Sequence, residues 1–393
     1  MIVNMKTLSR YFSLFLIFVF AVATFPATAQ IDIHNLTPQQ QRTFENKLKQ
    51  RGVEVEYNKL SADEKERYYW YIKQEELKEQ QARQRQQPGQ MQNVNVNNRY
   101  NNILIPLTDF GDRRYQGVKG GLYLNGENVR PQAHNEAGLE IAQGIKPLDR
   151  NGKVDEKNGM IVWISIGMSN TTQETERFLE LMKKYPDKNP CLELVDGAFG
   201  GMEINRINDI RAPYWDNIVS QRLEPRGISP EQVQIVWFKL AEAQPMDTIF
   251  TAYTRKLKEK YLSAMQIVKK KFPNVRIAYL SSRIYGGYAK TGLNPEPFAW
   301  YTGWANKLLI EDQINGDPRL AFTGNDAKVP WLSWGPYLWA NGTTPNAQGI
   351  SWVESDMMDD GTHPGNDARQ KVAEALIQFF STDETTVLWF LKK

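Results

Sequence analysis

An aspartate, Asp360, stands three residues before His363, which is one of only three histidines in the chain. At this spacing a carboxylate can orient a neutral imidazole and stabilise the imidazolium that forms when the ring takes up a proton. An imidazole held in this way can activate a serine hydroxyl as a nucleophile. The pair therefore predicts a general base with its orienting acid, and the partner serine must come from elsewhere in the sequence.

The candidate nucleophile is Ser169, which comes just after the apolar, β-branched run MIVWISI at residues 160–166. Such a run is typical of a strand that is buried on both faces, and the glycine at position 167 ends it. Open α/β sheets bind their ligands at the carboxyl ends of the strands. We therefore expect Ser169 to lie at that edge of a sheet and to meet His363 there.

Strand patterns alternate with helix patterns through most of the chain. The expected strands are residues 160–166, 192–195, 232–238 and 275–280, and the expected helices are residues 172–184, 248–271 and 367–380. Strands separated by helices favour a mainly parallel sheet that is covered on both faces. The sequence thus predicts an α/β fold, a three-layer α/β/α sandwich.

The overall charge and the scarcity of metal-binding residues exclude several classes of function. The net charge is only +3 over 393 residues, so no strong field favours nucleic acid or an anionic membrane as a partner. Cys191 is the only cysteine, and we expect it to be a packed strand residue. His134 is expected to be a surface histidine in a loop-rich region, and the acidic run that begins at Asp149 is expected to be a loop rather than a calcium site. We expect no metal and no cofactor.

The N-terminus has the features of a cleavable export signal. Lys6 and Arg10 precede an apolar run at residues 11–23, and an A-x-A cleavage pattern follows at residues 27–29. The apolar run is shorter than the roughly 20 residues that span a bilayer. We therefore predict a signal peptide at residues 1–29, a secreted or periplasmic protein, and no membrane span in the mature form.

The mature chain is expected to have an N-terminal extension before its main domain. Residues 30–90 are rich in glutamine and carry helix-start signals at Thr37 and Ser61, and residues 91–102 form an Asn-rich linker. The aromatic cluster at residues 68–72 has two interpretations: a docking surface for a partner in the cell envelope, or a face that packs against the first helix or the main domain. The main domain is predicted at residues 103–393.

Three segments resemble blocks I, II and V of the SGNH (GDSL-like) hydrolase superfamily. They are GMSNT at residues 167–171, DGAFGG at residues 196–201 and DGTHP at residues 360–364, in the order the family has them. The resemblance covers about residues 155–382. It implies the flavodoxin-like sheet of that superfamily and a serine ester hydrolase that acts without a cofactor.

The resemblance also implies roles for individual residues. Ser169 would be the nucleophile, His363 the general base and Asp360 the residue that fixes its tautomer. The backbone N–H groups of Ser169 and Gly200 would form the oxyanion hole, where each donor contributes about 3 to 4 kcal/mol in the transition state. Gly197 and Gly201 are rivals for the glycine position and candidates for substrate contact.

One block departs from the family pattern. Where the family has a Gly-x-Asn-Asp segment after the third strand, this chain has Lys239 and no asparagine. The Lys239 ammonium could replace the missing amide in the oxyanion hole, or it could form a salt bridge with an acidic neighbour such as Glu242. Both alternatives remain open from the sequence.

The substrate is less well defined than the chemistry. Arg283 follows the fourth strand, where it could hold an anionic group of the substrate or pair with a structural acid. Three tryptophans, Trp331, Trp334 and Trp339, fall in a Gly/Pro-rich segment. They have two interpretations: exposed platforms that stack on sugar rings, or packed core residues.

Two functions from different classes follow. The leading hypothesis is an exported serine ester hydrolase that acts on a small-molecule or carbohydrate ester, with acylated carbohydrate as the favoured class. The alternative is a non-catalytic glycan-binding or envelope-scaffold protein that retains the hydrolase fold, because the block III asparagine is missing.

Overall fold

The computed structural model describes residues 34–62, 64–65, 68, 72, 104–324 and 326–392. The predicted signal peptide and the predicted linker lie outside the described residues. The chain divides into two compact units, one of residues 1–94 with 114–118 and one of residues 95–113 with 119–393.

The first unit contains helix α1 (Pro38–Lys49) and a short 3₁₀ turn (Tyr57–Lys59). Thr37 and Gln40 form the reciprocal capping box at the start of α1, which confirms the helix start expected from the sequence. Ser61 and Glu64 exchange the same kind of bonds at the second predicted start. Tyr68 packs against the small apolar cluster of this unit, as the packing interpretation expected for that aromatic residue.

The second unit is built on a parallel five-stranded sheet with the order β4-β3-β5-β6-β7. The strands are β3 (Ile161–Gly167), β4 (Leu192–Asp196), β5 (Val233–Lys239), β6 (Ile277–Leu280) and β7 (Trp331–Trp334). Numbered along the chain, this order is 2-1-3-4-5, which is the order of flavodoxin-like sheets. The order reverses between β3 and β5, so the ligand-binding switch point lies at the carboxyl ends of these two strands.

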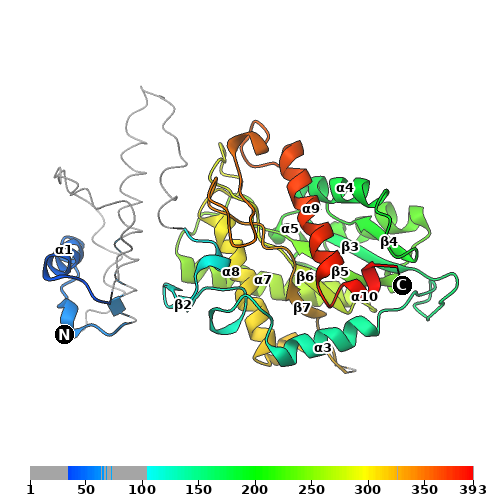
Figure 1. Cartoon of the computed structure of the whole chain (residues 1–393), viewed down its shortest axis with the longest axis horizontal. Coiled ribbons are helices and arrows are strands. Elements are labelled where there is room, and N and C mark those ends of the chain that lie inside the picture. The colour runs from blue at the N-terminus through cyan, green and yellow to red at the C-terminus, as the bar shows by residue number, and fades with distance from the viewer. Residues whose placement is uncertain are drawn as a thin grey trace. The chain divides into compact units, whose positions relative to one another are not determined.

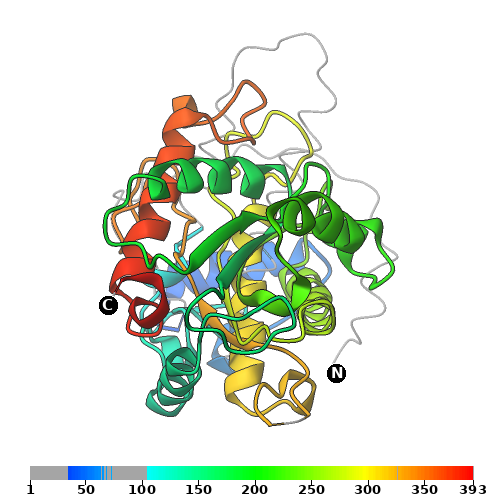
Figure 2. The same ribbon diagram turned by 90° about the vertical axis from the view of Figure 1, so that its right-hand side faces the viewer.

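Helices cover both faces of this sheet (Figure 1). Their bounds are α3 (Gln132–Gln143), α4 (Ser169–Met182), α5 (Ile204–Ile207), α6 (Pro213–Ile218), α7 (Phe250–Lys271), α8 (Phe298–Ile314), α9 (Asn366–Thr382) and α10 (Val387–Phe390). Two strands of two residues each, β1 (Arg114–Tyr115) and β2 (Val118–Lys119), form a small hairpin that comes before these helices along the chain. Figure 2 shows the green α4 and the red α9 on one side of the sheet, and the yellow-green α7 and the yellow α8 on the other.

Alternating side chains of the central strands join these layers. Trp163 of β3 stacks on Trp237 of β5 and also contacts Phe178 of α4. The next residue, Phe238, points to the opposite face and meets Tyr261 of α7 edge to face. Both central strands are buried along their whole length, which explains why they read as continuous apolar runs rather than as alternating patterns.

Several elements were not expected from the sequence, and α8, β7 and α3 are the most instructive of them. Helix α8 is buried on nearly all sides, so its apolar residues follow no helical period and give no amphipathic signal. Strand β7 has only four residues and lies within a Gly/Pro-rich segment. Helix α3 begins after Pro131 without a side-chain cap, and it occupies the region that was expected to be loop-rich.

The expected three-layer α/β/α architecture with a flavodoxin-like sheet is confirmed. The seven expected elements exist, with bounds that differ by up to three residues from those predicted. The largest shift that bears on the site is at α4, which begins at Ser169 itself. Among the described residues no helix is long and apolar enough to cross a membrane. No cluster of metal-binding side chains occurs within the same residues.

Candidate active site

Ser169, His363 and Asp360 meet at the switch point of the sheet. Ser169 opens α4 directly after β3, and its Oγ lies 2.7 Å from Nε2 of His363, although 194 residues separate the two. Nδ1 of His363 lies 2.5 Å from Oδ2 of Asp360. The His363 side chain is 22% exposed and that of Asp360 is 32% exposed, so a substrate can reach the pair from solvent.

The hydrogen bonds assign the proton on His363. An ionised carboxylate can only accept hydrogen bonds, so Nδ1 must donate to Asp360. Nε2 of the neutral ring is then an acceptor and receives the hydroxyl hydrogen of Ser169. This is the tautomer in which a histidine can remove a proton from serine.

Backbone hydrogen bonds fix the Asp360 carboxylate. Its Oδ1 accepts from the N–H groups of Thr362 and His363, each at 2.9 Å. Partial burial raises the pKa of Asp360, but these bonds and the bond from the His363 ring outweigh burial and hold its pKa below the usual value. Asp360 therefore stays charged while it orients the imidazole.

Asn170 ties the nucleophile to the segment that carries the base. Its side chain is buried, and Nδ2 donates to the carbonyl oxygen of Thr362 at 2.9 Å. On the other side of that segment, the N–H of Lys290 donates to the carbonyl oxygen of Asp360. No role was predicted for Asn170 from the sequence. The only sequence signal for such a role was that this short polar residue directly follows Ser169.

The turn at residues 196–201, which we call the block II turn, lies beside Ser169. Of its glycines, Gly200 is nearest to the serine: a Cβ placed on Gly200 would lie 4.0 Å from Ser169 Cβ. No described residue accepts a hydrogen bond from the Gly200 N–H. The first N–H groups of a helix also lack internal partners, and Met168 offers no capping side chain at the start of α4. The N–H groups of Gly200 and Ser169 thus lie close to the serine side chain without an acceptor among the described residues.

The two rival glycines have other roles. The Gly197 N–H donates to Ser165 Oγ, and a Cβ at Gly197 would come within 2.6 Å of the Ser165 carbonyl oxygen, so Gly197 faces β3 rather than the substrate. Gly201 has a φ of 75°, a conformation that favours glycine, and nothing lies within 4 Å of its Cβ position. Of the three glycines, Gly200 therefore lies nearest to Ser169.

Lys239 does not face the substrate side of the site. Its ammonium and the Glu174 carboxylate of α4 are both fully buried, with Nζ 2.7 Å from Oε2. Burial lowers the pKa of Lys239 to about 8; Glu174 opposes this shift and Arg283 adds to it. The salt-bridge alternative therefore fits the geometry and the oxyanion alternative does not. The suggested partner was wrong as well, because Glu242 pairs with Lys260.

Arg283 is also buried, with a residue exposure of 1%. Among the described residues, no group accepts a hydrogen bond from its Nε or Nη1. The acids that act on it electrostatically are Glu174, Glu296 and Asp360. A guanidinium so enclosed does not reach a substrate, and within the described residues it forms no direct salt bridge with these acids either.

The other candidates are core residues. His134 is buried in α3, where it stacks on Trp331 and lies 2.8 Å from the carbonyl oxygen of Leu332, so the expectation of a surface histidine was wrong. Trp331, Trp334 and Trp339 are at most 2% exposed. They pack in the core and form no platform for a sugar ring.

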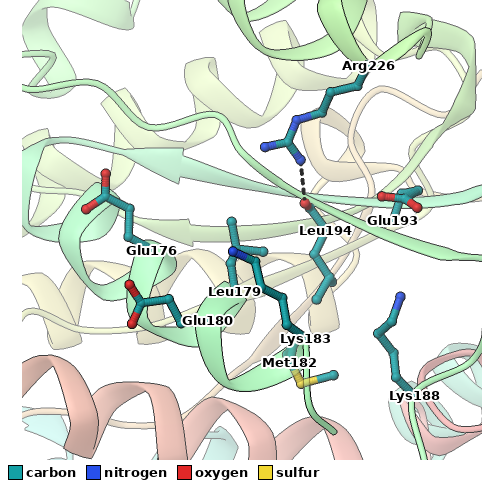
Figure 3. Close-up of a pocket in the computed structure, with 9 residues that line it drawn as sticks. All are labelled: Glu176, Leu179, Glu180, Met182, Lys183, Lys188, Glu193, Leu194 and Arg226. Atoms are coloured by element: carbon teal, nitrogen blue, oxygen red, sulfur yellow. Dashed lines mark hydrogen bonds between the residues drawn. The ribbon is translucent and has the colours of Figure 1, made fainter.

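A cavity of about 450 Å³ lies away from these residues, along α4 and the edge strand β4 (Figure 3). Its lining contains acids and bases in equal measure: Glu176, Glu180, Glu193, Lys183, Lys188 and Arg226, with Leu179, Met182 and Leu194. No member of the Ser169 site contributes to it. We assign it no ligand.

No protein-family profile and no curated protein matches the chain. Three solved structures are similar at low identity. A protein from Bacteroides fragilis provisionally named an acylhydrolase is 12% identical, with a match that covers 66% of this chain and all of that one at a TM-score of 0.34. A GDSL-like lipase from Bacteroides thetaiotaomicron is 9% identical, covering 63% and 96% at a TM-score of 0.32.

The third is a salicylyl-acyltransferase from a tetracycline biosynthetic pathway, which is 11% identical over 58% of this chain and 56% of that one, at a TM-score of 0.30. Similarities this distant do not reveal what the chain acts on. The strand order and the site geometry come from the structure itself. What the structure shows is a sheet with the flavodoxin-like strand order and, at its switch point, the expected serine, histidine and aspartate within hydrogen-bonding distance of one another.

Proposed function

We propose that this protein is an exported serine ester hydrolase. The observation that carries the proposal is the continuous hydrogen-bonded chain from Ser169 Oγ through His363 to Asp360 at the partly exposed edge of the sheet. Such a chain supplies a nucleophile, a base and an orienting acid in one place. Export is proposed from the signal-like pattern of residues 1–29.

The proposed reaction has two halves. Ser169 Oγ attacks the ester carbonyl carbon while Nε2 of His363 takes the hydroxyl proton, and the N–H groups of Ser169 and Gly200 stabilise the oxyanion. The bond to the alcohol oxygen breaks as His363 returns the proton to it, which leaves an acyl-enzyme. Water then gives its proton to His363 and attacks the acyl carbon. The bond between that carbon and Ser169 Oγ breaks as His363 returns the proton to Oγ, which releases the acid and restores Ser169.

The nature of the alcohol part stays open within this proposal. The three tryptophans that favoured a sugar substrate are core residues. The missing block III asparagine, in contrast, still supports the alternative of a non-catalytic scaffold, because the buried Lys239 cannot replace its amide. The proposal therefore rests on two backbone donors, without a third donor from a side chain.

Covalent labelling separates the two functions. An organophosphonate should react with the wild-type protein at Ser169, and short p-nitrophenyl esters should be hydrolysed. Mass spectrometry of the labelled peptide locates the adduct. A folded wild-type protein that neither accepts the label nor hydrolyses any of a panel of acyl esters would support the scaffold instead.

A further inference from the structure

Arg222 lies beneath the block II turn and contacts three of its residues. It belongs to the π-helical turn Val219–Leu223, which follows α6. Its Nη2 donates to the carbonyl oxygen of Ala198 at 3.3 Å and lies 3.7 Å from Oδ2 of Asp196. Its guanidinium carbon stands 4.4 Å from the centre of the Phe199 ring. Single π-helical turns are often found at functional sites.

The same turn is bound to the end of β3 on its other side. Oδ1 of Asp196 accepts from Ser165 Oγ and from the Ala198 N–H. The Phe199 N–H donates to the carbonyl oxygen of Gly167, two residues before the nucleophile. Asp196, Ala198 and Phe199 are thus held, and the next residue in the chain is Gly200, whose N–H is the proposed donor.

We infer that Arg222 is a positioning residue for the oxyanion hole: it fixes the block II turn so that the Gly200 N–H points at the reacting carbonyl oxygen. This inference rests on the proposed ester hydrolase function. The hydrogen bond, the ion pair and the ring contact of Arg222 go to Ala198, Asp196 and Phe199, so it acts through the turn and not on the substrate.

Arginine has the shape that these contacts require. Its flat face covers an aromatic ring while its edge donates hydrogen bonds in the same plane, which the compact ammonium of lysine cannot do. Among the described residues, no group accepts from the buried Nε of Arg222. The ring of Phe199, the Asp196 carboxylate and the Ala198 carbonyl oxygen are therefore the groups that hold this cation in place.

Loss of this support should affect the transition state more than the ground state. An oxyanion donor acts only when its hydrogen lies within bonding distance of the developing charge, and removal of one such donor lowers kcat by about 10² to 10³. A loosened turn should reduce part of that contribution. Substrate binding, which does not depend on this donor, should change little.

The test compares Arg222→Met with Arg222→Lys and with a matched control, Arg226→Met. Arg226 lies four residues further along the chain and, like Arg222, bonds to the region of β4. Its Nη1 donates to the carbonyl oxygen of Leu194 within β4 and not to the block II turn (Figure 3). For Arg222→Met we expect kcat to fall by about ten- to thirtyfold with KM within threefold. Arg222→Lys should recover part of the loss, and Arg226→Met should stay within twofold of wild type.

Amide hydrogen exchange gives a readout that needs no activity. The peptide that covers residues 196–201 should exchange faster in Arg222→Met than in the wild type and in Arg226→Met. A turn without its arginine should more often open the bonds from the Ala198 N–H to Asp196 Oδ1 and from the Phe199 N–H to the Gly167 carbonyl oxygen. Unchanged exchange, or faster exchange with unchanged kcat, would overturn the inference. A wild-type protein that hydrolyses no ester would instead overturn the proposed function, and with it the catalytic part of this inference, whatever the exchange shows.

Discussion

Helix α4 carries two polar side chains, five residues apart, that differ in their exposure to solvent: Ser169 is part of a partly exposed site, and Glu174 is fully buried. At its start, Ser169 belongs to a partly exposed hydrogen-bonded chain with His363 and Asp360. Further along, Glu174 forms a fully buried ion pair with Lys239 of β5. The first group is open to substrate, whereas the second joins a helix to the sheet.

The two regions differ in what holds their charges. The Asp360 carboxylate is stabilised by backbone N–H groups and stays partly exposed. Its negative charge can therefore stabilise the imidazolium that forms when His363 takes up a proton. Lys239 has lost its water and depends on Glu174, and burial has lowered its pKa. A cation at the ligand end of a strand is therefore no sign of a catalytic role unless its head group reaches the surface. Four predictions test this distinction.

The largest effect is expected at Ser169. Ser169→Ala and His363→Ala should each lower kcat/KM by on the order of 10⁴-fold or more, because a nucleophile without its base does little. The double variant should be no slower than either single variant. Hydrolysis of a p-nitrophenyl ester measures all three.

A matched control is Ser381→Ala, which removes an exposed hydroxyl near the end of α9 and should leave the rate unchanged. Asp360→Asn should fold normally and be slow, because the imidazole loses the charge that selects its tautomer. If Ser169→Ala kept more than a tenth of the wild-type rate, the nucleophile would be a different residue.

The second prediction concerns the buried pair. Lys239→Met leaves the Glu174 carboxylate buried and unpaired, so the free energy of unfolding should fall by about 3 to 5 kcal/mol. Turnover of the folded fraction should remain within threefold of wild type. Urea denaturation and kinetics on the same preparation give both quantities.

The matched control for this prediction removes both charges. Lys239→Met combined with Glu174→Leu should recover most of the lost stability, because a well-packed apolar pair can replace a buried ion pair. The opposite pattern, a hundredfold lower kcat with an unchanged melting temperature in Lys239→Met, would return Lys239 to the oxyanion hole. It would also remove the distinction drawn between the two regions.

The third prediction addresses the connection between the nucleophile and the base. Asn170→Ala deletes the bond to the Thr362 carbonyl oxygen and should lower kcat about tenfold, because small displacements of catalytic groups have large effects on rate. Gln173→Ala, on the same helix, is the control and should stay within twofold. Equal rates for the two variants would mean that Asn170 does not hold the catalytic segment.

The smallest effect is expected at His134, far from the site. Burial lowers the pKa of His134, and the nearby Arg130 lowers it further, while its bond to Leu332 acts in the other direction. The unfolded state therefore binds a proton at higher pH than the folded state does. The stability that His134 contributes is present above its ordinary pKa of about 6.5 and is lost as the pH falls below it.

The effect can be measured by thermal unfolding at several pH values between 7.5 and 5.5. This is roughly the pH range in which an ordinary histidine titrates. His134→Gln keeps a donor for Leu332 and cannot titrate, so the wild type should lose more stability than the variant as the pH falls. Parallel curves for the two proteins would show that His134 does not contribute.

Much of the fold and the triad could be predicted from sequence because local patterns encode them. Asp360 and His363 are three residues apart, so the chain alone brings them close. The strand before Ser169 is a continuous apolar run because both of its faces are buried. Burial had the opposite effect on the prediction of helix α8. A helix that is buried on nearly all sides has no polar face, so its sequence shows no helical period.

The sequence by itself determined the residue types, the order of the strands and helices along the chain, and the short-range pairing of Asp360 with His363. Only the tertiary structure decided which distant groups meet: that Ser169 lies 2.7 Å from His363, and that Lys239 pairs with Glu174 and not with the nearer Glu242. Lys239 lies on the same face of β5 as Trp237, beneath α4, and this packing gives its ammonium a carboxylate partner away from water. Such pairings depend on how a helix lies on a sheet, which no local spacing specifies.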